Sequence, residues 1–159
     1  MDKASFRHAM SHFASGVTIM TTSAGGTAHG MTVSAFASQS LDPLLILVSV
    51  ERSTTMHKLV MESRAFAINI LGENGEGTAR FFADNARLSG PEFREGAYHL
   101  GVTGSPILEE ATAYLEAALD GTLEAGDHTI MVGRVEALKV VREDAAPLIY
   151  YRSRYRRLA

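Results

Sequence analysis

Cysteine is absent from this sequence of 159 residues. Without a thiol the chain forms no disulfide, no thiolate metal site and no cysteine nucleophile. No apolar run comes near the ~20 residues that a membrane-spanning helix requires. These absences exclude a disulfide-stapled scaffold and thiol chemistry, and they predict no membrane partner.

Export signals and a basic surface are also missing. The N-terminal stretch MDKASFRHAMSHF has neither a long apolar core nor a small-residue cleavage pattern. The formal net charge is −3, whereas nucleic-acid-binding proteins usually carry a basic footprint. We therefore expect a cytoplasmic protein that binds no nucleic acid.

Several common site motifs are not found. Gly72, Gly75 and Gly77 lack the order of a Gly-x-Gly-x-x-Gly motif, and the strand before them lacks the usual acidic partner. The sequence has no Walker loop and no G-x-S-x-G elbow. His8 and His12 are four residues apart and can face one metal ion, but no third ligand accompanies them. We interpret both as surface or interface histidines and expect no metal site.

The residues that are present describe an ordinary globular chain. A hydrophobic fraction of 46% and a charged fraction of 21% predict one domain over residues 1–159. Apolar residues near the N-terminus recur at helical steps, and they predict a helix that Asp2 or Ser5 caps and Gly16 ends. Its apolar face consists of Phe6, Met10, Phe13 and Val17.

Strand patterns follow this helix. Val17–Ser23 is rich in β-formers, Gly25-Gly26 signals a tight turn, and His29–Ala37 predicts the returning strand of a hairpin. Leu44–Val50 is a nearly continuous apolar run, which predicts a strand buried on both faces. Ala65–Leu71 predicts another short strand.

Two further helices are expected in the middle of the chain. Ser53-Thr54-Thr55 is typical of a helix start. The apolar face that follows it consists of Met56, Leu59 and Val60. Thr78–Ala83 predicts a second helix, whereas residues 84–104 show a mixed pattern that predicts no definite element.

The C-terminal half is expected to form strands. Leu115–Leu123 alternates, which predicts a half-buried strand with Glu116, Asp120, Thr122 and Glu124 mostly on its outer face. Ala125–Asp127 is its turn, Thr129–Val141 the next strand, and Pro147–Tyr151 a last short one. Many strands with hairpin turns and few helices indicate a closed or nearly closed antiparallel barrel.

A hydroxyl-rich segment is the first candidate for a binding site. Its polar residues are Thr32, Ser34, Ser38, Gln39, Ser40, Ser49, Ser53, Thr54 and Thr55. No Lys or Arg lies between Gly25 and Glu51. Hydroxyls and backbone N–H groups can bind a phosphate or a heterocycle edge, and a hydroxyl-capped helix N-terminus is an anion site. The alternative is that these are strand residues and caps without a ligand, and composition alone leaves both open.

The same segment, GMTVSAFASQSLDPLLILVSVERSTT, resembles the flavin-binding signature of the short-chain flavin reductase family. Other pieces are similar to that family in the same order: FRHAMSHFASGVTIMTT, ARFFAD, AGDHTIMVGRV and LIYYRSRYRRL. The resemblance runs from Phe6 to Leu158. One departure is Asp42-Pro43-Leu44, where the family has Pro-Pro after the serine, and we expect only a small change in the turn.

The resemblance implies a mainly β, antiparallel Greek-key split β-barrel with a few flanking helices. It implies a homodimer that holds FMN or FAD near the subunit interface. It also implies hydride transfer from NADH or NADPH to that flavin, with a separate monooxygenase as the partner that receives reduced flavin.

Site residues are carried over from the resemblance. The flavin ring and ribityl chain would contact Thr32, Ser34, Ala35, Ser38, Gln39 and Ser40, and the next strand would add Ser49, Val50 and Glu51. Ser53 and Thr55 would take the phosphate, and Arg80 and Phe81, or the neighbouring Phe82, would close the pocket.

The nicotinamide side is expected at His128, where an imidazole can hydrogen-bond a carboxamide or donate a proton. The alternative is a turn residue satisfied by Asp127. Under the resemblance, Tyr151, Arg152 and Arg154 contact pyridine nucleotide phosphates. Read without it, the basic, aromatic tail fits a solvated, dimer-facing end or a nucleic-acid contact.

Two rival functions remain open. The barrel can be an FMN-binding electron carrier or oxidase that keeps its flavin, or a non-enzymatic dimeric module that has lost its ligand. The hydroxyl-rich segment speaks against the second rival.

Overall fold

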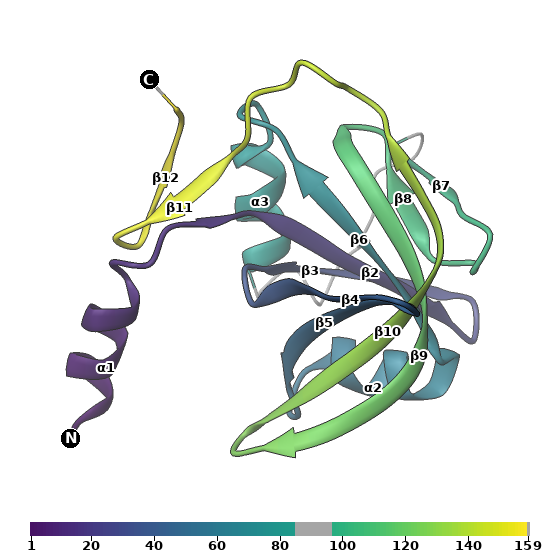
Figure 1. Ribbon diagram of the computed structural model, residues 1–159, viewed down its shortest axis with the longest axis horizontal. Coiled ribbons are helices and arrows are strands. Elements are labelled where there is room, and N and C mark those ends of the chain that lie inside the picture. Colours follow the sequence, from purple (N-terminus) through teal and green to yellow (C-terminus); the bar gives the residue numbers. More distant parts are fainter. Residues whose placement is uncertain (85–96, 159) are drawn as a thin grey trace.

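The computed structural model describes residues 1–84 and 97–158. The main element of the fold is one antiparallel sheet of seven strands in the order β3-β2-β6-β9-β10-β5-β4 (Figure 1). The strands are β2 (Thr18–Ala24), β3 (Thr27–Val33), β4 (Phe36–Leu41), β5 (Leu44–Glu51), β6 (Ala65–Leu71), β9 (Ala111–Ala125) and β10 (His128–Val140). The mainly β, antiparallel fold class is thereby confirmed.

The smaller elements surround this sheet. Three helices are α1 (Lys3–Met10), α2 (Thr55–Ser63) and α3 (Glu76–Ala83). Three short strands, β1 (Ser15–Gly16), β11 (Ile149–Tyr151) and β12 (Arg154–Arg156), form a separate sheet. A small hairpin is made by β7 (Tyr98–Leu100) and β8 (Pro106–Leu108). Residues 85–96, part of the stretch without a clear sequence pattern, lie outside the described residues.

The sheet is a barrel with one split. The two edge strands, β3 and β4, are joined by only Ser34 and Ala35. Two residues span less than ~8 Å, so the sheet must curl until its edges meet. No ladder joins these edges in the strand order, and the split therefore lies beside the Ser34–Ala35 link.

Two apolar clusters fill the fold. The barrel interior is filled by Met20, Ile46, Val48, Val50, Phe66, Ile68, Leu119 and Met131, and by Met56 and Val60 of α2. A second cluster lies under α3 and includes Val17, Leu71, Phe82 and Leu148. A Cβ on Gly133 would lie 2.6 Å from the Phe66 ring and 2.8 Å from Ala117, so close packing across β10 requires glycine there.

The helix α2 is as the sequence indicated. Thr54 is its N-cap, and its hydroxyl accepts a hydrogen bond from the His57 N–H at 3.2 Å. The helix ends at Arg64, which adopts the left-handed conformation. Met56 and Val60 are fully buried, because one helical face closes the barrel end.

The N-terminal helix is shorter than its apolar spacing suggested. It ends at Met10, because the chain turns over the next residues and Ser15–Gly16 pairs with β11. Gly16 is therefore a strand residue and not the helix end. The Asp2 cap is confirmed: its carboxylate accepts the Ser5 N–H at 2.8 Å, and this bond lowers the Asp2 pKa.

Three strand expectations are corrected. The return strand expected over His29–Ala37 is two strands, since β3 ends at Val33 and the chain passes to the opposite edge. The run Leu44–Val50 is not buried on both faces, since Leu44 is 47% exposed. Pro147–Tyr151 was predicted to contain the last strand, but a further strand, β12, follows β11.

Glu116 keeps the face that the alternation predicted, opposite Leu115 and Ala117, which pack on the barrel core. Its side chain is nevertheless buried, because the stretch around Thr103 covers it. One carboxylate oxygen accepts hydrogen bonds from the Thr103 N–H at 2.8 Å and the Thr103 hydroxyl at 2.9 Å. Leu123, expected on the inner face, is exposed because the β9–β10 hairpin extends beyond the barrel (Figure 1).

No helix in the described parts of the chain has both the length and the apolar character needed to cross a bilayer. Within the same parts, no group of three or more His, Asp or Glu side chains gathers in a way that could hold a metal ion. His8 and His12 instead form an edge-to-face ring pair with centroids 5.0 Å apart.

Candidate functional site: a cavity at the split of the barrel

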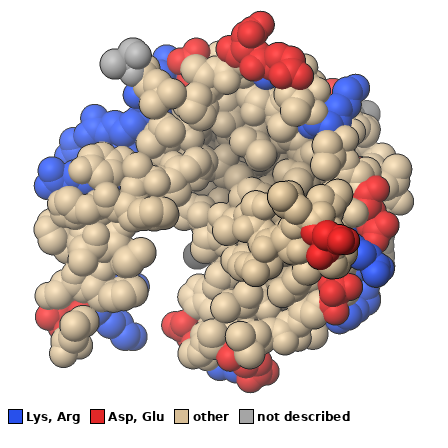
Figure 2. Space-filling view, viewed as in Figure 1, with Lys and Arg blue, Asp and Glu red and all other residues tan. Residues whose placement is uncertain are grey.

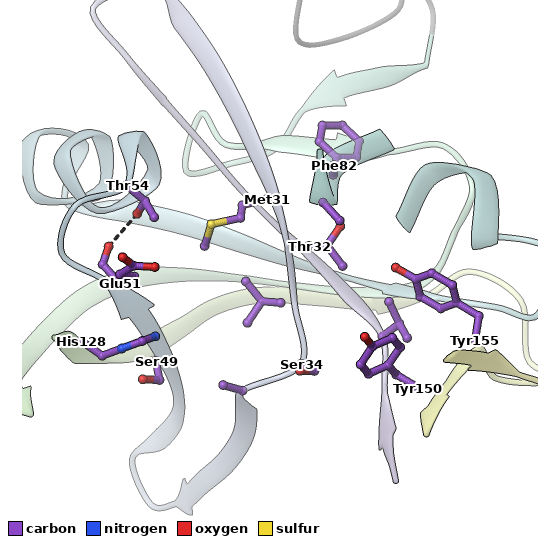
Figure 3. A pocket seen from close by; sticks show the side chains of 14 residues that line it. Met31, Thr32, Ser34, Ser49, Glu51, Thr54, Phe82, His128, Tyr150 and Tyr155 are labelled. Carbon is purple, nitrogen blue, oxygen red and sulfur yellow. Dashed lines mark hydrogen bonds between the residues drawn. The ribbon is translucent and has the colours of Figure 1, made fainter. Parts of the chain in front are cut away.

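A cavity of about 400 Å³ opens at the split (Figure 3). Its floor is residues 31–35, which are the end of β3 and the two-residue link. Other walls come from the C-terminal end of β5, the start of β10, the caps of α2 and α3, and the C-terminal hairpin. Those walls contribute Ser49, Glu51, Thr54, Phe82, Ala83, His128, Tyr150 and Tyr155, and Val17, just before β2, also lines the cavity.

The link presents backbone and hydroxyl groups to the cavity. Ser34 and Ala35 are both exposed. The Ala35 carbonyl accepts the Ser49 N–H at 3.0 Å, which holds the link against β5. The remaining polar groups of the link have no strand partner in the sheet order. Because backbone N–H and C=O groups need partners, this edge is suited to a polar heterocycle.

The start of α2 forms the second polar wall. Thr54 donates its hydroxyl to the Glu51 carbonyl at 2.7 Å. Ser53 donates its hydroxyl to a Glu51 carboxylate oxygen at 2.7 Å. The amides of a first helical turn lack intrahelical acceptors, so this wall offers N–H donors to an anion, with the Glu51 carboxylate beside them.

His128 stands at the mouth of the cavity, directly opposite Glu51 in the β5–β10 ladder. Its Nδ1 lies 2.7 Å from an Asp127 carboxylate oxygen. Because a carboxylate only accepts, Nδ1 carries the hydrogen, and Nε2 is left for a ligand. The same bond is the main cause that lowers the Asp127 pKa. Figure 3 shows the imidazole beside Ser49.

The helix α3 supplies an aromatic wall. Thr32 donates its hydroxyl to the Ala79 carbonyl at 2.7 Å, which fastens α3 to β3. Phe82 lies over Gly30, where an added Cβ would be 2.6 Å from the ring. The hydroxyl of Thr32 thus positions the helix that carries Phe82, in addition to lying at the cavity wall.

Two tyrosines of the C-terminal hairpin form the wall on the side away from His128 (Figure 3). The Tyr150 and Tyr155 rings have centroids 5.3 Å apart and are tilted by 58°. The Arg80 guanidinium lies 5.0 Å from the Tyr155 ring centroid. Burial, and then the neighbouring Tyr150, raise the pKa of Tyr155, so this wall is neutral and aromatic at physiological pH.

The sequence matches the flavin reductase like domain over residues 10–159. The chain belongs to the flavin reductase family. It is 38% identical over 155 residues to the reductase component of a 4-nitrophenol 4-monooxygenase/4-nitrocatechol 2-monooxygenase of Rhodococcus opacus, covering 98% of this chain and 80% of that protein. It is 39% identical to an NADH-dependent flavin reductase of Rhodococcus sp, covering 96% of this chain and 84% of the relative.

Solved structures of flavin reductases share the fold. The NADH:FAD oxidoreductase of Streptomyces globisporus C-1027, in complex with NAD and FAD fragments, superposes with a TM-score of 0.92 at 33% identity, covering 99% of this chain and 93% of that one. The flavin reductase component of a bacterial two-component tryptophan halogenase gives 0.91 at 34% identity, covering 99% and 98%. The resemblance seen in the sequence is confirmed.

The residues of this flavin reductase cavity fit a flavin. Its volume of about 400 Å³ lies within the ~300–1,000 Å³ usual for ligand pockets. Met31, Phe82 and the tyrosine wall offer apolar surface for a flat ring, while Ser34, Ser49 and the link offer hydrogen bonds to its edge. A phosphate fits the first turn of α2.

Seven of the residues carried over from the family gather at this cavity. Those that line it are Thr32, Ser34, Ala35, Ser49, Glu51, Phe82 and His128. The others do not: Ser38, Gln39, Ser40, Ser53, Thr55 and Phe81 lie outside its wall, and Val50 is fully buried in the barrel core. Their roles toward a flavin stay predictions.

Arg80, predicted to close the flavin pocket, lies outside its wall and lines a neighbouring cavity together with Arg154 of the C-terminal tail. The other two tail residues lie elsewhere. Tyr151 packs edge-to-face on His12 with centroids 6.4 Å apart, and Arg152 donates its N–H to the Ser11 carbonyl at 2.8 Å. These two residues therefore hold the N-terminal segment.

Sequence reasoning missed several residues of the wall. Chief among them are Tyr150 and Tyr155. Thr54 was part of the hydroxyl-rich segment, although the contacts carried over from the family did not include it. For the tyrosines, only the strand register of a hairpin decides whether Tyr150 or Tyr151 faces the cavity.

Proposed function

We propose that this protein is a flavin reductase that transfers a hydride from NADH to FMN or FAD and passes the reduced flavin to a separate oxygenase. The single observation that carries the proposal is the cavity at the barrel split, where a polar link, a helix start and an aromatic wall meet beside His128. Relatives are named as NADH-dependent flavin reductases.

When bound, the flavin supplies the ring that accepts the hydride. The Ser34–Ala35 link and Ser49 bind the edge of this ring, and the first turn of α2 binds its phosphate. Phe82 and the tyrosine wall exclude water from the ring face. Orientation of this kind is worth up to ~7–11 kcal/mol of barrier in favourable cases.

His128 binds the hydride donor. Asp127 accepts the Nδ1 hydrogen and so fixes the imidazole ring. Nε2 then faces the carboxamide of the nicotinamide, as a hydrogen-bond acceptor in the neutral ring and as a donor in the protonated ring. The role of Asp127 is to fix the orientation and tautomer of the imidazole. The pair thus satisfies both interpretations of His128, as a turn residue and as a ligand.

A second copy of the chain completes the molecule in this proposal. The helix α1 buries none of its residues and projects from the barrel (Figures 1 and 2). Phe6 is 59%, Met10 52% and Phe13 73% exposed. A free helix of this length is unstable in water, so an apolar partner surface is needed, and a homodimer supplies one.

The location follows from the substrate. NADH is produced in the cytoplasm, and we place the protein there together with its oxygenase. Relatives include the reductase subunit of a flavin-dependent monooxygenase of Rhodococcus jostii, which supports an oxygenase as the acceptor of reduced flavin.

The test is a steady-state assay of the purified protein. Oxidation of NADH and NADPH is followed with FMN, FAD and riboflavin in turn. The proposal predicts turnover that depends on added flavin and is faster with NADH. Tightly co-purified flavin with negligible NADH turnover would instead favour an electron carrier or oxidase, and a preparation that binds no flavin would favour a non-enzymatic module.

A further inference from the structure

The start of α2 and the start of β10 carry the two ends of the proposed site. The first turn of α2 is the wall for the flavin phosphate, and His128 of β10 is the residue for the hydride donor. The β5–β10 ladder ends at the pair Glu51 and His128. Figure 3 shows Glu51 between His128 and Thr54, the cap of α2. The phosphate wall and the hydride-donor side therefore adjoin at the end of this ladder.

His57 connects these two ends beyond the ladder. Its backbone N–H donates to the hydroxyl of the Thr54 cap at 3.2 Å, so the residue belongs to the first turn of α2. Its ring Nε2 lies 3.0 Å from the Thr129 hydroxyl oxygen, and the two groups share a hydrogen bond. Thr129 directly follows His128 in β10. One side chain thus bonds the phosphate wall to the strand that carries His128.

Thr129 faces the barrel interior and not the cavity. It pairs with Val50, which is fully buried, and its own side chain is buried as well. A buried hydroxyl needs a hydrogen-bond partner, and the His57 ring supplies one. Because successive residues of a strand point to opposite faces, His128 faces outward, into the cavity that it lines. The bond from α2 to Thr129 therefore fixes the strand directly behind His128.

Arg52 makes a second connection between the same two segments. Its backbone N–H donates to the Asp127 carbonyl at 3.0 Å. Its guanidinium donates to the Gly126 carbonyl at 2.7 Å and pairs with Glu124 at 3.0 Å. These groups belong to the β9–β10 turn, where the Asp127 carboxylate holds the His128 imidazole. The hairpin extends beyond the barrel (Figure 1), so contacts of this kind determine where His128 lies.

We propose that His57 is a positioning residue that couples the binding of the two substrates. A phosphate that binds the first turn of α2 orders this turn, and the bond between His57 and Thr129 transmits the order to His128. A flavin that carries a phosphate then improves the binding of the nicotinamide, and linkage requires the reverse effect by the same factor. The inference rests on the proposed function and deepens it, because it connects the two substrate sites.

Equilibrium binding measures this coupling without turnover. Flavin fluorescence gives the Kd of FMN and of riboflavin, each with and without saturating NAD⁺, which has no hydride to donate. In the wild type we expect NAD⁺ to tighten the binding of FMN about fivefold more than that of riboflavin, which lacks the phosphate. His57→Ala should abolish this difference, and Thr129→Val, which removes the same hydrogen bond, should abolish it equally.

Two further variants separate positioning from stability. His57→Gln keeps a hydrogen-bonding group near the place of Nε2 and should restore the difference between FMN and riboflavin. Val60→Ala removes core packing from the same helix without touching the bond, so it should lower the melting temperature and leave the difference unchanged. Melting curves show whether each variant is folded.

Three results would overturn the inference. They are equal effects of NAD⁺ on FMN and riboflavin in the wild type, a difference that survives in His57→Ala or Thr129→Val, and a difference that is lost in Val60→Ala or not restored in His57→Gln. Reduction of FMN by NADH in the wild type tests the proposed function separately. A wild type that reduces FMN but shows no difference between the two flavins would contradict the coupling alone.

Discussion

At the scale of single residues, the hydrogen bond between His128 and Asp127 is the main chemical device of the site. The 2.7 Å contact assigns the imidazole hydrogen to Nδ1 and leaves one ring nitrogen toward the cavity. Because its orientation is already fixed, the imidazole loses little further conformational entropy when it binds the substrate. The role of His128 therefore depends on Asp127 as much as on the position of His128 itself.

Replacing His128 by Ala is expected to raise KM for NADH about two- to tenfold, since one hydrogen bond contributes ~0.5–1.5 kcal/mol. The KM for flavin should change less. Steady-state kinetics with NADH and FMN check this. His99→Ala is the matched control, because His99 is exposed and pairs with Glu109 away from the cavity. Equal kinetics in the two variants would remove His128 from the site.

Thr32 has a positioning role that a reading of hydroxyls as ligands overlooks. Thr32→Val removes the bond to the Ala79 carbonyl and is expected to destabilise the fold by ~0.5–1.5 kcal/mol. It should also raise KM for flavin through displacement of Phe82. Thr32→Ser keeps the hydroxyl and should restore both values. Thermal melts and flavin KM values check this, and a serine variant as impaired as the valine one would refute the role.

The raised pKa of Tyr155 predicts how the stability of the fold depends on pH. Burial, and then Tyr150, raise its pKa above the ordinary 10.0. Because the folded pKa exceeds the unfolded one, this phenol stabilises the fold below its ordinary pKa, and the contribution is lost as pH rises through the folded value. An ultraviolet titration should lose its latest tyrosine step in Tyr155→Phe. An unchanged titration would show that Tyr155 ionises normally.

At the scale of elements, the contact between α3 and β3 decides the shape of the cavity. Phe82 reaches the wall only because Gly30 has no side chain beneath the ring. The other wall depends on a two-residue hairpin turn, and the floor on a two-residue link. Each wall is thus set by a short connection or a missing side chain.

In Gly30→Ala the added Cβ would lie 2.6 Å from the Phe82 ring, and we expect it to push the ring away. Overpacking of this kind costs ~1–3 kcal/mol, and the flavin KM should rise with it. Gly121→Ala is the control, since its Cβ would meet nothing within 4 Å. Denaturant melts and flavin titrations check the pair. Equal stability of the two variants would contradict the packing argument.

Local elements were predictable from the sequence, and non-local ones were not. The cap at Thr54 and the strand Ala65–Leu71 were readable, because capping and short apolar runs depend on neighbours in the chain. The break at Ser34–Ala35 was not, because β-forming residues continue through it and only barrel closure interrupts the strand. The burial of Glu116 was not readable either, because the stretch around Thr103 that covers it shows no clear sequence pattern.

The site residues also divide into those that the sequence predicted and those that only the fold determines. Resemblance to a family supplied the hydroxyl segment and His128, and the structure gathers many of these residues at one cavity. The resemblance assigned both Ser49 and Val50 to the flavin site, although the Val50 side chain lies in the core. Strand alternation decides that choice, and alternation is unreadable in a continuous apolar run such as Leu44–Val50.

At the scale of the whole molecule, the projecting helix α1 is the feature that one chain alone does not explain. Phe6→Asp combined with Phe13→Asp is expected to convert the proposed dimer to a monomer, because charges would enter an apolar contact. Light scattering after size exclusion checks this. Val102→Asp, also at an exposed apolar residue, is the control. A wild-type monomer would contradict the proposed homodimer.

The central claim is that a flavin ring lies at the split of the barrel, against the Ser34–Ala35 link and Ser49. A crystal structure with excess FMN tests it most directly. The account predicts ring density between the link, the Phe82 ring and the tyrosine wall, with phosphate density at the first turn of α2. FMN bound elsewhere, with this cavity filled by side chains, would contradict it.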